Sequence, residues 1–199
     1  MASDVDIANT ALTSLGATTI SSLDENTNAA RVMNQRFNNV RDDVFRSHPW
    51  NCLISRVDLG QETATPAFGY AHQYALPADF LRVLEFTNGT LTYPQDNMIS
   101  NSGGAVYVIE GKRLLTDEDT AMIKYIARVT DPNQLDANVI EALAARLAME
   151  CCYKITGSTS MVQQMRSLYD DKLKQARFTD ATEGAPMRIE ASDFIESRF

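Results

Sequence analysis

The sequence predicts an α+β protein: a four-helix bundle with an inserted, mostly antiparallel β-rich subdomain and an extended C-terminal tail. Apolar residues recur every three or four positions in residues 1–50 and 131–180, which is the period of a helix with one buried face. In residues 51–130 the spacing falls to about two, which indicates strands. No sustained period remains in residues 181–199. We therefore expect a helical domain from the first two segments, an inserted subdomain from the third and a tail from the last.

The first two helices are delimited by capping and stop residues. The first is expected over residues 4–15, with Ser3 as its N-cap and Gly16 as its stop. The second is expected over residues 27–47 and ends before Pro49, because the residue preceding a proline avoids the helical conformation. The expected inward faces are Ile7, Ala8, Ala11, Leu12 and Leu15 in the first helix and Ala30, Met33, Phe37, Val40 and Val44 in the second.

β-forming residues and turn signals predict one small, largely antiparallel sheet in the middle of the chain. Pro66, Gly69 and Pro77 break up its early part. Glu110-Gly111-Lys112 lies between two β-rich runs and predicts a hairpin. The expected strands are residues 53–59, 80–86, 105–109, 113–115 and 122–129.

The helical period returns after Asp131-Pro132-Asn133, which is a typical helix start. The third helix has a broad apolar face and ends at Gly157, so we expect it to be central to the core. The fourth is capped by Ser158 or Ser160 and runs to about Phe178. The expected inward residues are Val139, Ile140, Leu143, Ala144, Leu147, Ala148, Cys151 and Ile155 in the third helix and Met161, Met165, Leu168, Leu173 and Ala176 in the fourth.

Length and composition narrow the possible classes of protein. The chain has 199 residues, 44% of them hydrophobic and 22% charged, which suits one domain or one domain with an insertion. The net charge of −8 argues against tight wrapping of nucleic acid, since phosphates are neutralised by an excess of Lys and Arg. Three cysteines without a disulfide framework indicate synthesis in a reducing compartment. We expect no signal peptide and no membrane span.

Two loops could suggest a bound ligand, but neither has the required pattern. Residues 104–112 contain Gly-Lys, yet Arg113 follows where a phosphate-binding loop needs Ser or Thr. Asp117-Glu118-Asp119 lacks the alternating ligand spacing of a calcium loop, so we expect a solvated turn. We therefore predict no cofactor and no metal site.

The candidate catalytic side chains also have simpler roles. His48 follows the second helix and is expected to bond its terminal carbonyls, whereas His72 lies in an aromatic segment. Catalysis by either would need a nucleophile or carboxylate partner that the sequence does not place. Cys151 falls within an apolar helical stripe and is expected to be buried and inert. We therefore predict no catalytic residues.

Arginines and a C-terminal group of apolar residues point to assembly with other proteins. Arginine outnumbers lysine, and it suits interfaces because its guanidinium makes bidentate contacts. In the second helix the arginines are five apart, so they scatter around the helix and suit i,i+4 pairs and inter-subunit bridges. These are Arg31, Arg36, Arg41 and Arg46. In the tail, Phe194, Ile195 and Phe199 either pack back on the body, bind a partner or belong to a disordered segment.

The N-terminal quarter of the chain resembles the head-to-tail adaptor family of short-tailed bacteriophages, the tail tubular protein A-like proteins. The resemblance rests on Leu15-Gly16 at the end of one helix, on Ser22-Leu23-Asp24 with Asn26 and Asn28 in the linker, and on Trp50 closing the second helix. The order of two helices, a β-rich segment, two helices and a tail is also similar to that family.

The resemblance implies a virion structural protein and no enzyme. Such a protein is made in the host cytoplasm and forms a ring, a dodecamer, between the portal protein and the tail nozzle protein at the head-tail junction. DNA would pass through the ring during ejection without specific binding, and no membrane would be involved. Two alternatives remain: a head-completion or stopper connector of a long-tailed phage, and a virion-associated cell-wall hydrolase, which needs a pair of carboxylates in a cleft.

Overall fold

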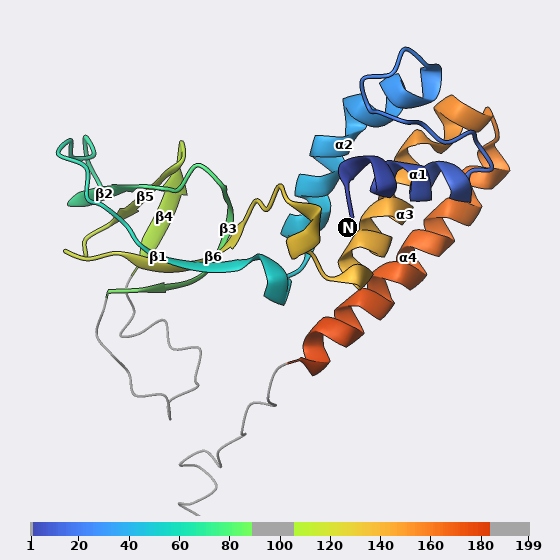
Figure 1. The fold of residues 1–199 in the computed structure, drawn as a ribbon. Coiled ribbons are helices and arrows are strands. Elements are labelled where there is room, and N and C mark those ends of the chain that lie inside the picture. Colours follow the sequence, from blue (N-terminus) through green and yellow to red (C-terminus); the bar gives the residue numbers. More distant parts are fainter. Residues whose placement is uncertain (1, 89–105, 184–199) are drawn as a thin grey trace, which may run out of the picture.

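The computed structural model describes residues 2–88 and 106–183, which form an α+β fold, as expected (Figure 1). In Figure 1 the helices gather at one end of the molecule and the strands at the other. The helices are α1 (Asp4–Ser14), α2 (Asn28–Ser47), α3 (Ala137–Thr156) and α4 (Thr159–Thr182), with short 3-10 helices at Asn51–Leu53 and Pro132–Gln134. The strands are β1 (Ile54–Asp58), β2 (His72–Ala75), β3 (Phe80–Thr87), β4 (Tyr107–Glu110), β5 (Arg113–Thr116) and β6 (Met122–Ala127).

The first two helices confirm the prediction to within one residue at each end. Ser3 and Asp6 form a reciprocal capping box at the start of α1, in which the Ser3 hydroxyl accepts from the Asp6 N–H at 3.1 Å. Gly16 has a φ of +66°, a backbone conformation that favours glycine after a helix. The N-cap of α2 is Thr27, whose hydroxyl accepts from the Ala30 N–H at 3.2 Å.

The last two helices differ from the prediction at one end each. Asp131-Pro132-Asn133 begins a 3-10 turn, where the Asp131 carboxylate accepts from the Asn133 N–H at 3.0 Å. The helix α3 starts only after its own N-cap, Asp136, so the predicted start is wrong because the local Asp-Pro signal is satisfied by a shorter turn. Ser158 caps α4, which continues to Thr182 instead of ending near Phe178 because the long-range contacts of Asp180 hold its last turn.

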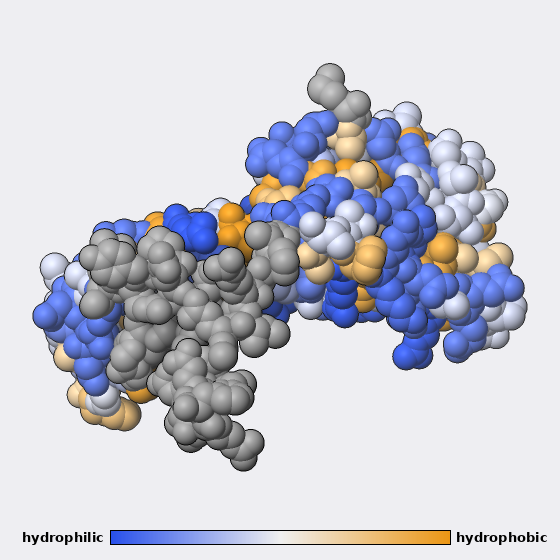
Figure 2. Space-filling model, turned by 90° about the horizontal axis from the view of Figure 1, so that it is seen from below, coloured by the Kyte–Doolittle hydropathy of each residue, from blue (hydrophilic) through white to orange (hydrophobic). Residues whose placement is uncertain are grey.

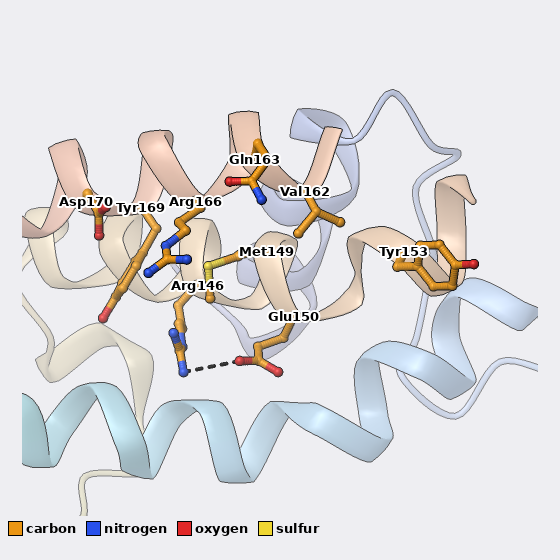
Figure 3. A pocket seen from close by; sticks show the side chains of 9 residues that line it. All are labelled: Arg146, Met149, Glu150, Tyr153, Val162, Gln163, Arg166, Tyr169 and Asp170. Atoms are coloured by element: carbon orange, nitrogen blue, oxygen red, sulfur yellow. Dashed lines mark ion pairs between the residues drawn. The ribbon is translucent and has the colours of Figure 1, made fainter. Parts of the chain in front are cut away.

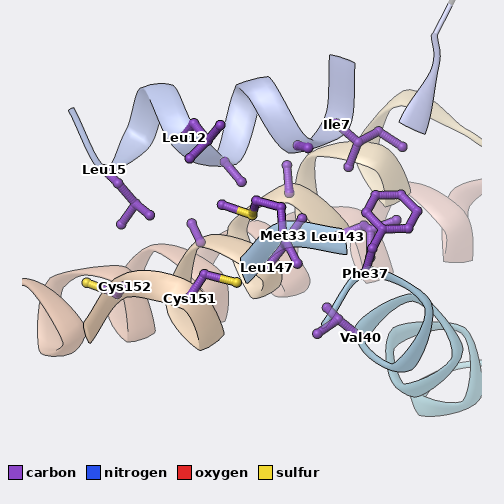
Figure 4. Close-up of a cluster of buried hydrophobic side chains, with 14 of the residues drawn as sticks. Ile7, Leu12, Leu15, Met33, Phe37, Val40, Leu143, Leu147, Cys151 and Cys152 are labelled. Atoms are coloured by element: carbon purple, nitrogen blue, oxygen red, sulfur yellow. The ribbon is translucent and has the colours of Figure 1, made fainter. Parts of the chain in front are cut away.

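One hydrophobic cluster contains side chains from all four helices, and α3 packs against each of the other three or shares this cluster with them (Figure 4). Leu147 of α3 has no exposed surface, and Cys151 is equally buried. The prediction that α3 is central to the core is therefore confirmed. Other members are Ile7 and Leu12 of α1, Met33, Phe37 and Val40 of α2, Leu143 and Cys152 of α3, and Met165 of α4.

The strands form two antiparallel three-stranded sheets, where the sequence predicted a single sheet. Their orders are β1-β6-β3 and β2-β5-β4. The hairpin between β4 and β5 is confirmed: Gly111 and Lys112 both have positive φ angles, as a two-residue hairpin turn of this hand requires. The strand β2 was not predicted, because its four residues pair with β5 across a long stretch of chain and carry little local pattern.

The central strand β6 contacts a different hydrophobic cluster on each face, although Met122 and Lys124, on the same face as Ile126, are not buried. Ile126 packs into a cluster with Phe45, Trp50 and Leu53, on the side of the helices. Ile123, Tyr125 and Ala127 point the other way and join Tyr74 and Leu114 of the second sheet. The alternation read from residues 122–129 is therefore real: the face of Ile123, Tyr125 and Ala127 is buried, and the opposite face is buried at Ile126 alone.

The predicted tail begins too early, since residues 181 and 182 belong to α4. The remainder of the tail, residues 184–199, lies outside the described residues, as does Ala105 of the strand expected at 105–109.

Candidate functional site

The turn after α2 is fixed to the end of α4 by one carboxylate. Asp180 is only 6% exposed, and its Oδ1 accepts from the Asn51 N–H at 2.8 Å. Its Oδ2 lies 3.1 Å from Nε2 of His48, and its backbone carbonyl accepts from the Asn51 side-chain amide at 2.8 Å. The expected role of His48 is therefore wrong: the ring bonds a side chain of α4 instead of a carbonyl of its own helix.

The carbonyls at the C-terminus of α2 are satisfied by aromatic and cationic side chains. The indole N–H of Trp50, which is fully buried, donates to the Val44 carbonyl at 3.0 Å. Arg82 of β3 donates to the Arg46 carbonyl at 3.0 Å, and Arg177 of α4 donates to the Ser47 carbonyl at 3.3 Å. Cations at this end also interact favourably with the helix dipole. The helices and the first sheet therefore meet at the C-terminus of α2. We call this region the α2 junction; it is formed by His48, Trp50, Asn51, Arg82, Arg177 and Asp180.

Three arginines of α2 make contacts other than the expected i,i+4 pairs, whereas the expected inter-subunit bridges stay a prediction. Arg36 pairs with Glu150 of α3 at 2.7 Å, and Arg46 donates to the Leu81 carbonyl. Arg41 is buried and bonds its neighbour Asp42 at 3.2 Å. Among the residues that the structure describes, none of these three makes an i,i+4 ion pair. The partners of Arg36 and Arg46 lie on other elements, which spacing along one helix does not reveal.

A shallow groove of about 460 Å³ lies between α3 and α4 (Figure 3). Arg146 closes it on the side of α2 through Asp43 at 3.2 Å and Glu150 at 3.1 Å. The guanidinium also lies 5.3 Å from the centre of the Tyr169 ring. Burial raises the pKa of Tyr169, and Arg146 acts in the opposite direction. The groove is lined by Arg146, Met149, Glu150, Tyr153, Val162, Gln163, Arg166, Tyr169 and Asp170.

The large exposed hydrophobic side chains lie at scattered points. Phe68, in the segment before β2, is 89% exposed, and Phe178 of α4 is 73% exposed. Tyr153, at one end of the groove, is 58% exposed. In the view of Figure 2, hydrophobic surface appears as small patches among hydrophilic residues. No broad apolar face is visible in that view of the described residues, so any contact surface there is mixed.

The acidic turn and His72 connect loops of the second sheet. Nε2 of His72 lies 3.2 Å from Oδ1 of Asp119, and the Gln61 amide donates to its Nδ1 at 2.8 Å. Asp117 accepts from the Ala71 N–H at 2.8 Å. The side chain of Asp119 is 96% exposed, as expected for a solvated turn. Within residues 2–88 and 106–183, no group of three or more His, Cys, Asp or Glu side chains could hold a metal ion.

Cys151 is buried, as predicted. Burial raises the pKa of its thiol to about 11, and its Sγ lies 3.9 Å from the Val32 carbonyl. Such a thiol is a poor nucleophile, because the thiolate is the reactive form. The Gly-Lys pair considered as a phosphate loop forms the hairpin turn described above, and Gly104 lies outside the described residues.

The predicted partner-binding residues Phe194, Ile195 and Phe199 also lie outside the described residues. Sequence reasoning missed Asp180 and Arg146. Asp180 follows a polar helical stretch and carries no local signal. Arg146 could have been noticed, since it is a charge within the apolar run of α3.

The residues that carry the adaptor resemblance hold the helices in place. Gly16 ends α1, and Asp24 in the linker accepts from the Asn34 side chain of α2 at 3.1 Å. Trp50 closes α2. Comparison with models of known protein families and with curated proteins finds no match. No helix among the described residues is both long enough and apolar enough to cross a membrane.

Proposed function

We propose that this chain is a virion structural protein, a head-to-tail adaptor that forms a ring between the portal and the tail nozzle around the DNA channel. The main support for the proposal is that the residues on which the family resemblance rests have structural roles. Gly16, Asp24 and Trp50 each fix the end or the packing of a helix. A ring subunit that connects two other proteins needs helices that are packed rigidly against one another.

The finer architecture belongs to the same proposal. Residues 1–50 and 131–180 would form a four-helix bundle, with residues 51–130 as an inserted subdomain. The shared cluster of α1 to α4 supports the first part, and the cluster between the two sheets supports the second. The α2 junction would then set the angle between the two parts.

The charge of the chain suits a channel for DNA. Each subunit carries a net charge of −8, so twelve copies would bring together many carboxylates. DNA carries one negative charge per about 1.7 Å, and an acidic wall repels it. The genome would therefore pass without specific binding.

The tail would supply part of the attachment. Phe194, Ile195 and Phe199 would bury a few hundred Å² against portal or a neighbouring subunit, which at about 25 cal/mol per Å² contributes several kcal/mol before ordering costs. Fixing a residue costs roughly 1–2 kcal/mol, so one tail binds weakly. Many tails engaging one ring bind well because the contacts are multivalent.

The test is mass measurement and sedimentation of the purified protein with portal-bearing particles. We expect the full chain to co-sediment and to form a ring on them. A chain ending after Glu183 should remain folded and attach poorly; the cut follows Glu183 because Asp180 is needed at the α2 junction. Equal co-sedimentation of both chains would remove the tail from the interface. A full chain that neither assembles nor attaches would refute the adaptor function.

The two alternatives give different results in the same experiments. A stopper or head-completion connector would attach to long-tailed phage heads and to no short-tailed portal. A cell-wall hydrolase would release peptidoglycan fragments, and a single His48 or carboxylate substitution would abolish that activity. We expect no such activity.

A further inference from the structure

We propose that in the unassembled subunit the C-terminal segment, residues 184–199, docks in the groove between α3 and α4 of its own chain. Phe194 and Ile195 would occupy the apolar floor, and Asp193 or Glu196 would pair with Arg166. This docking does not depend on the proposed function. It goes beyond that function by naming where the apolar tail residues lie before any partner is bound.

The groove offers a floor of the right chemistry. Met149, Val162 and Tyr169 are half-buried on its base, and Tyr153 is 58% exposed at one end. In Figure 3, Tyr153 and Tyr169 mark opposite ends, and Arg166 extends from α4 between them. Tyr153, Tyr169, Met149 and Val162 form a surface that suits apolar side chains, because burial of apolar groups against it releases water and brings rings into contact. It therefore suits the side chains of Phe194 and Ile195.

The groove is lined by two arginines, Arg146 and Arg166, and by two carboxylates, Glu150 and Asp170. Arg146 already bonds Asp43 and Glu150, so it is not available. Arg166 is exposed, and among the described residues it has no ion-pair partner. In the C-terminal segment, Asp193 and Glu196 flank Phe194-Ile195, so a carboxylate lies next to each apolar residue. The segment would thus supply the carboxylate partner that Arg166 does not have among the described residues.

The reach of the segment fits the groove of the same chain. Asp180 fixes the last turn of α4, so the origin of the segment is fixed too. From Thr182 back to Tyr169 the helix rises about 20 Å, and to Val162 about 30 Å. The eleven peptide links from Glu183 to Phe194 span at most about 36–40 Å when extended. Phe194 can therefore reach the groove as far as Val162 by folding back beside α4.

A second hollow of about 410 Å³ near the end of α4 is less suitable. Its walls include Ile54, Leu84 and Ala181, which are apolar. Its cations are already paired, Lys124 with Glu85 at 2.7 Å and His48 with Asp180 at 3.1 Å. An acidic segment gains less there, because it would compete with existing carboxylates. This hollow serves as the internal control of the test.

The test places a photo-reactive benzophenylalanine at Tyr153 in the full chain, which keeps an aromatic ring in the groove. After irradiation and trypsin digestion, we expect cross-links to the peptide of residues 189–198. The same probe at Leu84 or Phe68 should give at least about tenfold fewer cross-links to that peptide. Preferential cross-linking from Leu84, or none from Tyr153, would overturn the proposal.

Mixing ¹⁵N-labelled and unlabelled chains distinguishes the source of the segment. Docking within one chain gives cross-linked pairs of a single isotope, and mixed pairs would show that the segment comes from a second copy, which also overturns the proposal. Phe194→Ser with Ile195→Ser should lower the yield more than tenfold, since both apolar side chains that would contact the groove are replaced by a small polar one. Arg166→Glu should lower it too, whereas Arg166→Lys and Met187→Ser should retain it. None of these readouts involves portal, so they fail or succeed separately from the adaptor function.

Discussion

Asp180 is a nearly buried carboxylate that accepts hydrogen bonds from the turn after α2. Asp180→Asn replaces one of its two acceptor oxygens by a donor, which leaves the Asn51 N–H or His48 without a partner. We expect a loss of about 1–3 kcal/mol of unfolding free energy, measured by urea denaturation. The matched control is Asp171→Asn on the same helix, where the side chain is 75% exposed and the effect should stay within about 0.5 kcal/mol. Equal effects of the two substitutions would contradict the junction.

Cys151 provides a test of burial that involves no stability measurement. Its pKa rises from 9.0 to about 11, so at pH 8 it has about a hundredfold fewer thiolates than an ordinary thiol. We expect iodoacetamide to modify it only as fast as the protein unfolds, while urea-denatured protein reacts at once. Rapid alkylation of Cys151 in the native protein, mapped by peptide mass, would show that α3 is not central.

The raised pKa of Cys151 also makes the free energy of unfolding decrease with rising pH. Because the folded pKa lies above the unfolded one, the neutral thiol stabilises the fold below about pH 9, and this contribution is lost as pH rises towards 11. The stability difference between the native chain and Cys151→Ala should therefore narrow over that range. A constant difference would mean that the thiol is solvated.

At the scale of elements, Gly157 connects α3 to α4 in a left-handed conformation with φ of +68°. A Cβ at this position would meet nothing within 4 Å, so Gly157→Ala changes only backbone strain. We expect a loss of about 1 kcal/mol, because residues with a side chain disfavour this conformation. Gly60→Ala is the control: it has equal space and no positive φ, so it should be neutral or slightly stabilising. Similar melting temperatures for both variants would argue against this helix ending.

At the scale of the whole molecule, α3 supplies the surface on which the other helices pack. Leu147→Asp places an unpaired charge in that cluster, where Leu147 has no exposed surface. The expected penalty of several kcal/mol is comparable to the total stability of a domain, so the variant should be unfolded by circular dichroism at 25 °C. Lys154→Asp, on the exposed side of the same helix, should change stability by about 1 kcal/mol or less. A folded Leu147→Asp protein would contradict the packing of the four helices.

The sequence predicted helices best where local chemistry decides. Ser3, Gly16 and Gly157 act through bonds or dihedral angles within a few residues, so their effects can be predicted without the fold. It predicted strands less well. The short strand β2 is stabilised by β5, some forty residues further along the chain, and no local pattern records that pairing.

At the candidate site too, the sequence predicted what depends on local pattern and did not predict partners that are distant in the chain. The burial of Cys151 followed from its place in an apolar stripe, and the structure confirms it. The partner of His48 could not be predicted, because Asp180 lies far away in sequence and nothing in its surroundings marks it. Arg36 likewise binds Glu150 across two helices.

The sequence alone determined the α+β class, the helix ends set by local caps, the hairpin at Gly111-Lys112 and the central position of α3. These depend on hydrophobic period and on bonds between near neighbours, which are short-range. Only the tertiary structure decided the division into two sheets, the extension of α4 to Thr182 and the closure of the α2 junction by Asp180. Those features arise from contacts between segments distant in the chain, whose free energy exists only once the segments have been brought together.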